Sequence, residues 1–335
     1  MPRTGKISRA FFEDHIATRL GADREDVALG PTHGVDFGVV EVDDSAVVSA
    51  TDPISVLPEL GFERAGEFAV GIVLSDVAVS GIPPSHLTIS FSLPPEITDE
   101  EFSRIWGAID AECRDLGVSI VTGHTARYEG ASFPWVGAAT AMGVGDPDNI
   151  VRPDGARPGD DLLVTKGPAV EVTGLFATLF GDRIDLPADT LETARERLDE
   201  TGTVRDALTA AAAGRVTAMH DATEGGLLGA LHEVAESAGV RLTVDSDAVP
   251  MRPAVEAVSE ALSMDPWRAS TAGTLVIAVD PTDTDAVLSA LEARGTPVGL
   301  VGSVESGAGV VLDGEPTDPP EGDSGWPVYE RLLDS

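Results

Sequence analysis

VVSATDPISVLPELGFERAGEFAVGIVLSDVAVSGIPP, from Val47 to Pro84, predicts a buried strand, then a loop and an apolar helix. We expect Asp52 at the end of the strand, before Pro53, and Asp76 inside the helix, far from either helix end. A carboxylate in such apolar surroundings is costly unless a metal ion, an arginine or backbone N–H groups offset its charge. This stretch therefore marks where a functional site is to be sought.

Strand and helix patterns mix on both sides of it, which predicts an α+β fold rather than one doubly wound sheet. The strands VVEV and AVVSA predict a hairpin around an Asp43-Asp44-Ser45 turn. Residues 145–161, rich in Pro, Gly and Asp, predict a boundary between domains 1–150 and 151–335. The final fifteen or so residues predict an irregular tail. Helices are expected at residues 7–20, 64–81, from Thr98, 170–180, 190–213 and 221–237.

The composition limits the possible partners. Acids outnumber bases 57 to 22, the net charge is -35, and Lys6 and Lys166 are the only lysines. Because the acids are spread along the whole chain, a halophilic, salt-adapted surface is the favoured interpretation, and an acidic partner-binding surface is the alternative. Nucleic-acid binding is disfavoured, since no basic stripe is available to displace counterions.

The cellular compartment follows from what the sequence lacks. Cys113 is the only cysteine, so no disulfide and no cysteine-based zinc site is expected, and its helical context predicts a core thiol. The first residues lack the apolar run of a signal peptide, and no stretch approaches 18 apolar residues. We expect a cytoplasmic protein.

Three aspartates are candidate metal ligands. Asp36 lies between glycines in GVDFG, and it joins Asp52 and Asp76 as an acid on a separate element. Each also has an ordinary structural explanation: a turn for Asp36, a cap or turn for Asp52, and a buried, hydrogen-bonded carboxylate for Asp76. Together they match the oxygen ligands that Mg²⁺ prefers beside a phosphorylated nucleotide.

The second half contains an anion-binding candidate, HDATEGGLLGAL. Asp221 and Glu224 form a D-x-x-E pattern that resembles a capping box. Gly225 and Gly226 open the backbone at the helix start, so that N–H groups could face an anion there. Lys166, in VTKG after a predicted strand, is either a phosphate contact or placed there by chance. His124, in VTGHTA, is a surface or capping histidine or a site residue.

The motifs GPTHGVDFGVV, ATDPI, LSDVAVSGIPP, VTGHT and HDATEGGLLGAL occur in the order found in the AIR synthase (PurM) superfamily. The chain most resembles its HypE-like archaeal branch, through GKIS, STAGTLVIAV and VGLVGSV. The superfamily also contains thiamine-monophosphate kinase and selenophosphate synthetase. The resemblance implies a two-domain fold, with an N-terminal domain that binds ATP and Mg²⁺ and forms a β-barrel across a homodimer, and a C-terminal domain that closes the cleft.

The resemblance also implies roles for single residues. Asp36, Asp52 and Asp76 match the metal and nucleotide motifs, with Asp52 shared between the two. His124 and Thr125 match a TGDT/TGHT position. Asp221 and Glu224 match the second-domain DxTxGG motif. The catalytic candidates are therefore His124, Asp221 and Glu224, and the cofactor-binding candidates are Asp52, Thr125, Lys166, Gly225 and Gly226.

Two departures separate the chain from its relatives. HypE works through a cysteine at its extreme C-terminus, whereas this sequence ends ERLLDS, which argues against true HypE chemistry. The kinase branch has paired aspartates in its first motif, whereas GVDFG has one. We therefore expect an ATP- and Mg²⁺-dependent enzyme with a small-molecule or protein-borne acceptor. The alternatives are a thiamine-monophosphate-kinase-like enzyme and a non-catalytic nucleotide-binding maturation protein.

Overall fold

The computed structural model describes residues 5–334 and divides the chain into two compact units. We call residues 24–30 and 36–150 the N-terminal unit, and the remaining residues the C-terminal unit. The division after Ile150 lies within the Pro-, Gly- and Asp-rich stretch. Residues 5–23, and Pro31–Val35, group with the C-terminal unit instead, although the chain order assigns them to the first domain.

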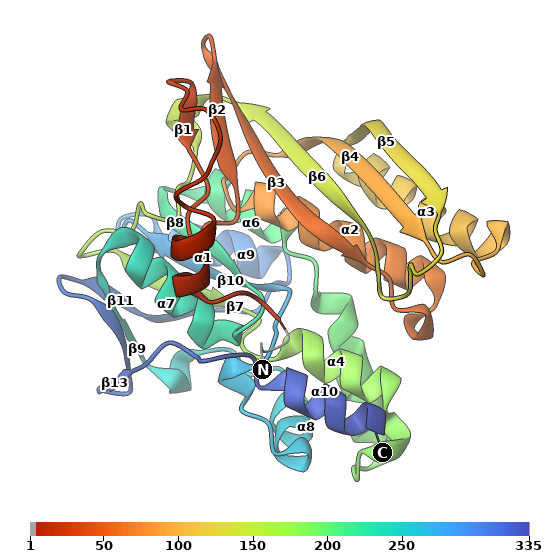
Figure 1. Cartoon of the computed structure of the whole chain (residues 1–335). Coiled ribbons are helices and arrows are strands. Elements are labelled where there is room, and N and C mark those ends of the chain that lie inside the picture. Colours follow the sequence, from red (N-terminus) through yellow and green to blue (C-terminus); the bar gives the residue numbers. More distant parts are fainter. Residues whose placement is uncertain (1–4, 335) are drawn as a thin grey trace. The chain divides into compact units, whose positions relative to one another are not determined.

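The N-terminal unit is a six-stranded sheet in the order β1-β2-β3-β6-β4-β5, with helices α2 and α3 on one face (Figure 1). All neighbours are antiparallel except β4 and β5, which are joined through α3. The elements are β1 Val27–Leu29, β2 Gly38–Val42, β3 Ser45–Ser55, α2 Phe62–Ala78, β4 Pro84–Leu93, α3 Asp99–Leu116, β5 Ser119–Arg127 and β6 Trp135–Gly145.

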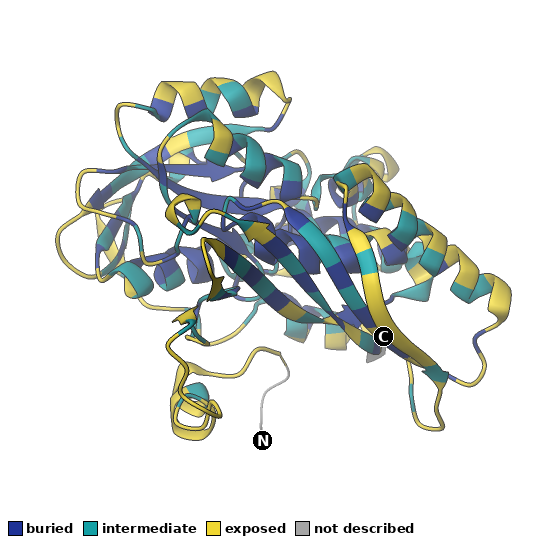
Figure 2. Cartoon of the chain, turned by 90° about the horizontal axis from the view of Figure 1, so that it is seen from above, coloured by how far each residue is buried: buried dark blue, intermediate teal, exposed yellow. Residues whose placement is uncertain are grey.

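Local sequence explains these elements. Asp43 adopts a φ of 52° in the β2–β3 turn, as the predicted hairpin requires. Thr98 and Glu101 form a capping box at the start of α3, and Gly117 ends it with a φ of 75°. Buried residues alternate with half-buried ones in the first half of β3, where Ala46, Val48 and Ala50 are buried. Figure 2 colours the strands by burial.

The C-terminal unit contains a seven-stranded sheet in the order β13-β12-β9-β11-β7-β10-β8. Its pairs are antiparallel except β12 with β9. The strands are β7 Asp161–Thr165, β8 Val216–Ala222, β9 Arg241–Val244, β10 Thr274–Val279, β11 Val298–Glu305, β12 Gly309–Leu312 and β13 Glu315–Thr317. The helices are α1 Arg9–His15, α4 Val170–Leu179, α5 Ala188–Arg195, α6 Val204–Ala213, α7 Gly226–Ala238, α8 Val255–Leu262, α9 Thr284–Ala293 and α10 Gly325–Asp334.

Two apolar clusters form the core of this unit. One lies between α7 and the sheet and includes Leu162, Leu227 and Leu231. The other joins α4, α5, α8 and α10 through residues such as Phe176 and Val328. No described helix is long and apolar enough to cross a membrane.

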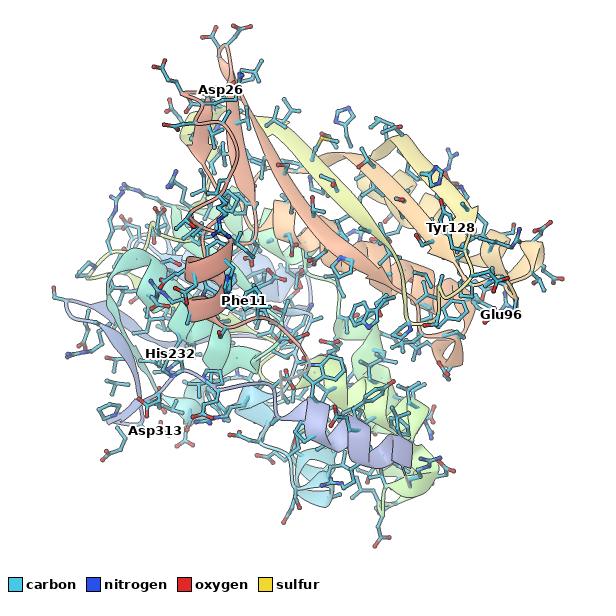
Figure 3. All side chains as sticks on the ribbon, in the orientation of Figure 1. Phe11, Asp26, Glu96, Tyr128, His232 and Asp313 are labelled. Atoms are coloured by element: carbon cyan, nitrogen blue, oxygen red, sulfur yellow. The ribbon has the colours of Figure 1, made fainter. Side chains whose placement is uncertain are left out.

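Several predicted elements differ in the structure. The expected tail is wrong for its last ten described residues, because Gly325–Asp334 folds as α10 and buries Val328 and Leu332. The predicted helix 190–213 is interrupted by a 3-10 turn, Glu196–Glu200, and by Gly202. The predicted helix 7–20 shortens to α1, which buries no residue; Phe11 projects from it (Figure 3).

Candidate functional site at the start of helix α7

The HDATEGG motif connects the edge strand β8 to helix α7. His220 and Asp221 lie within β8 and are 1% and 4% exposed. The helix begins at Gly226 rather than near Asp221, with Gly225 as its N-cap at a φ of 86°. The predicted capping box is wrong, because α7 has no side-chain cap. Asp221 remains in the strand, and the Glu224 carboxylate instead accepts a hydrogen bond from the Lys6 backbone N–H at 2.6 Å.

The two glycines have separate structural reasons. A Cβ on Gly226 would lie 2.6 Å from the Trp267 carbonyl oxygen, so the residue permits close approach of that backbone. Its N–H donates to the Thr223 carbonyl at 3.0 Å. The Gly225 N–H donates to the Asp323 carboxylate, also at 3.0 Å. Protein oxygens thus already accept hydrogen bonds from both of the N–H groups that the sequence motif predicts for an external anion.

Asp323 provides the anion that the helix start attracts. Its Oδ2 accepts hydrogen bonds from the Gly225 N–H and from the Ser270 hydroxyl at 2.7 Å. Its Oδ1 accepts from the Gly325 N–H at 2.6 Å. A carboxylate is favoured at this end of a helix, where the dipole is positive and N–H groups lack partners in the helix. The start of α7 is therefore an anion-binding position, occupied by a side chain from a distant part of the chain.

Two further acids surround this position; we call Glu171, Glu224 and Asp323 the acid cluster. Glu171, in the first turn of α4, is half-buried and accepts a hydrogen bond from the Ala272 N–H at 2.9 Å. Burial raises the pKa of Glu171 to about 7, and the charges of Asp323 and Glu224 act in the same direction against that hydrogen bond. Burial consequently favours the neutral form of Glu171 well above the pH at which an exposed glutamate ionises.

Sequence reasoning missed a second group, which we call the α7 triad: Glu233 on α7 together with His220 on β8 and Lys6, which precedes α1. The His220 Nε2 lies 2.8 Å from one Glu233 carboxylate oxygen, and the Lys6 Nζ lies 3.1 Å from the other. Burial alone would raise the pKa of Glu233, but hydrogen bonds and charges from His220 and Lys6 lower it to about 2. A Cβ on Gly34 would lie 3.1 Å from the Glu233 Cβ, so Gly34 leaves room for the glutamate stem.

One signal in the sequence could have pointed to the triad. Lys6 is one of only two lysines in a very acidic chain, and an ammonium group in such a chain readily finds a carboxylate. The partner Glu233 lies 227 residues away. No local pattern identifies that pairing.

Lys166 has a structural role. Its ammonium contacts the Asp206 carboxylate at 2.8 Å and the carbonyl oxygens of Glu200 and Gly202 at 2.9 and 2.7 Å. Both charged side chains of the pair are almost fully buried, at 7% and 4% exposure. Asp206 also accepts hydrogen bonds from Arg294 and Thr296. All three N–H groups of the ammonium thus have protein partners, which leaves none directed at a phosphate.

The N-terminal unit contains the three candidate metal ligands. Asp36 precedes β2 and Asp52 lies within β3, which continues to Ser55, so the expected strand end at Asp52 is wrong. Asp76 is 7% exposed and lies in the last turn of α2, not far from both helix ends as expected. Among the residues described in this unit, Asp36, Asp52 and Asp76 do not bring three ligand atoms within 4.8 Å of one another.

His124 and Thr125 lie on the exposed edge strand β5. The His124 Nε2 is 3.1 Å from the Tyr128 hydroxyl, just beyond the strand (Figure 3). Cys113, by contrast, is 2% exposed in α3, and burial raises the pKa of its thiol to about 11. The prediction of a core thiol rather than a nucleophile agrees with this position.

Comparison with known proteins adds the family. Residues 34–144 match the N-terminal domain of AIR synthase related proteins, and residues 157–315 match the C-terminal domain. The chain is 32% identical to a carbamoyl dehydratase HypE from Rhizobium leguminosarum bv. viciae, over 81% of this chain and 77% of that protein.

It is also 32% identical to a selenide, water dikinase from Geobacter metallireducens, over 75% of this chain and 71% of that protein. The fold matches the crystal structure of a hydrogenase maturation protein HypE in complex with ATP, with a TM-score of 0.63 at 24% identity, over 92% of each chain. The chain belongs to the AIR synthase-related (PurM) superfamily, with HypE-like proteins among its relatives.

Proposed function

We propose that the protein is an ATP- and Mg²⁺-dependent enzyme of the AIR synthase and HypE-like type. It would phosphorylate or dehydrate a small-molecule or protein-borne acceptor. The observation that carries this proposal is the start of α7, where the Gly225 N–H and the Ser270 hydroxyl already hold a carboxylate. The same donors suit a phosphate oxygen. The ATP-bound HypE of the same fold supports the nucleotide assignment.

The metal assignment depends on the N-terminal unit. Asp76 is buried in the last turn of α2, where the helix dipole opposes a negative charge, so a nearby cation would stabilise it. Asp52 is half-buried inside β3, against which α2 packs, and Asp36 precedes the neighbouring strand. One or two carboxylates together with phosphate oxygens and water are a usual ligand set for Mg²⁺. Since the three carboxylates do not converge on one point, one or two of Asp36, Asp52 and Asp76 would hold the ion together with phosphate oxygens and water. When bound, the ion would neutralise phosphate charge.

The other residues have supporting roles in this proposal. Glu224 directly precedes Gly225, and Asp221 lies three residues earlier in β8; both would orient the acceptor or take up its proton. His124 and Thr125, exposed on β5, would donate hydrogen bonds to the nucleotide, with His124 as a possible acid or base. The two relatives above are equally identical to this chain and have different names, so similarity alone does not select the acceptor.

The test is calorimetric titration of Asp76→Asn with Mg-ATP. We expect the Kd to rise at least about tenfold, equivalent to roughly 1.4 kcal/mol, because the variant removes the charge that faces the metal. The matched control is Asp44→Asn, which removes the same charge from the exposed β2–β3 turn and is expected to bind like the wild type. Unchanged binding by Asp76→Asn, with the fold intact by circular dichroism, would make Asp76 structural.

Turnover separates the enzyme from the accessory protein. Mg-ATP would be incubated with candidate acceptors, and phosphate release would be measured over time. Release that depends on one acceptor supports the enzyme. Tight Mg-ATP binding without release for any acceptor supports a nucleotide-binding maturation protein instead.

We also propose that the protein is a homodimer formed through the N-terminal sheet. On the face opposite the helices, cross-strand neighbours form a row of Val40, Val47 and Val144, the last of which is 51% exposed. A row of threonines crosses four strands beside it: Thr51, Thr140, Thr88 and Thr122. Apolar and hydroxyl side chains on an open face suit burial against a second copy.

By light scattering we expect the mass of a dimer for the wild type and of a monomer for Val144→Glu. The variant places a charge on the face that the proposed dimer would bury. Leu300→Glu changes a similarly exposed residue, 45% exposed on β11 of the other unit, and is the control. A dimer that survives Val144→Glu would contradict this interface.

A further inference from the structure

Residues 319–325 lie across the first turn of α7; we call them the covering segment. A Cβ on Gly225 would lie 3.4 Å from the Pro320 ring, and one on Gly229 would lie 3.6 Å from it. Asp323, three residues after Pro320, accepts a hydrogen bond from the Gly225 N–H. Pro320 thus lies in van der Waals range of the start of α7, and the segment covers the Gly225 N–H group that an external anion would need.

The segment is fastened on both sides of Asp323. The Ser324 hydroxyl donates to the Asp265 carbonyl at 2.6 Å, and the Ser324 N–H donates to the Arg268 carbonyl at 2.9 Å. Beyond it, α10 buries Val328 and Leu332 in an apolar cluster. Before it, His232 contacts the Thr317 hydroxyl at 3.0 Å; His232 is labelled in Figure 3. These anchors keep Asp323 close to α7 even when its own hydrogen bonds open.

The Asp323 contact itself depends on neutral donors. Its partners are two backbone N–H groups and one hydroxyl, whereas the charged neighbours Glu171 and Glu224 are acids that repel it. Each of these hydrogen bonds is charge-assisted, but an incoming anion replaces each of them, so exchanging one anion for the other has a modest net cost. The geometry thus combines a strongly anchored segment with a carboxylate that another anion can replace.

We propose that the covering segment is an internal competitor. Asp323 occupies the anion-binding position of α7, and it must leave before a phosphate group can contact the Gly225 N–H. This inference rests on the proposed function. Because the segment is tethered, the local concentration of the Asp323 carboxylate is high. The apparent affinity for the external anion is the intrinsic affinity multiplied by the fraction of molecules in which Asp323 has left the position.

The experiment compares Mg-ATP binding to the wild type, Asp323→Ala and Asp318→Ala by calorimetry. Asp323→Ala is expected to bind about tenfold more tightly, since the competing carboxylate is gone. Asp318→Ala removes an equal charge from an exposed position just before the segment and is expected to bind like the wild type. Ser270→Ala, which removes one hydrogen bond to the same carboxylate, should shift the affinity in the same direction by less.

The outcomes distinguish the competitor from the nucleotide site. Tighter binding by Asp323→Ala, or binding by this variant alone, supports the competitor. Equal binding by wild type and Asp323→Ala overturns the competitor and leaves the proposed function standing. Absence of binding by both overturns both. Thermal melting would check that each variant is folded, and in the folded wild type the NMR signal of the Gly225 amide should shift on addition of Mg-ATP.

Discussion

The acid cluster and the α7 triad each contain a glutamate that is largely withdrawn from water, and the pKa values of these two glutamates are shifted in opposite directions. Glu171 and Glu233 are both withdrawn from water, and burial alone would raise the pKa of each. Glu171 has acids as its charged neighbours, and its pKa rises to about 7. Glu233 contacts His220 and Lys6, and its pKa falls to about 2. In this very acidic chain, the rare cations decide which buried carboxylates remain charged.

Glu233→Gln is expected to have the larger effect. The folded-state pKa lies below the ordinary value of 4.5, so ionised Glu233 stabilises the fold above pH 4.5, and this contribution is lost as the pH falls towards 2. The shift corresponds to about 3 kcal/mol at pH 7. Denaturant unfolding at pH 7 and at pH 3, at fixed salt, would measure the difference between variant and wild type at each pH.

Lys6→Met is the companion variant. The Lys6 side chain is 44% exposed, so solvent screens its charge and a loss of at most about 1 kcal/mol is expected. If Lys6→Met destabilises the protein as much as Glu233→Gln, the lysine rather than His220 is the principal partner. A Glu233→Gln difference of equal size at both pH values would contradict the pKa argument.

Glu171→Gln is expected to have a smaller effect of opposite sign. The folded-state pKa lies above 4.5, so the wild type loses stability as the pH rises from 4.5 to about 7, and the loss is complete above that. A neutral glutamine avoids the loss, which corresponds to about 3 kcal/mol for the full shift. Because Glu171 is only half-buried, solvent screens part of this, and the variant should be more stable than the wild type by about 2 kcal/mol at pH 8. Below pH 4.5 the two proteins should unfold together. A variant less stable than the wild type at pH 8 would show that Glu171 is ionised and well paired.

Local patterns were enough to predict much of the fold. The β2–β3 hairpin, helix α2 and the start of α3 follow from Asp43, from an apolar run and from Thr98, all of which act within a few residues of themselves. The α+β class follows from the same patterns. Helix α10 was missed because Pro, Gly and Asp residues precede it, and its apolar face is recognisable only beside Phe176 and Phe180.

The site could be predicted only in part, because its contacts are distant in sequence. The HDATEGG motif predicts an anion at the start of α7, whereas in the structure the Gly225 N–H donates to the carboxylate of Asp323, 98 residues away. The Glu224 carboxylate does not cap α7; it accepts a hydrogen bond from the backbone N–H of Lys6, which is 218 residues away. A motif shows what a backbone can bind. It does not show whether a distant side chain of the same protein already occupies that backbone.

The position of Trp326 provides an optical reporter for this part of the molecule. Its indole lies three residues after Asp323, edge-on to the Tyr329 ring with 6.0 Å between centroids. A Cβ on Gly5 would lie 3.0 Å from the indole nitrogen, so the beginning of the described chain also borders it. Intrinsic fluorescence, read against Trp326→Phe, would therefore follow movement of the covering segment in the unlabelled protein.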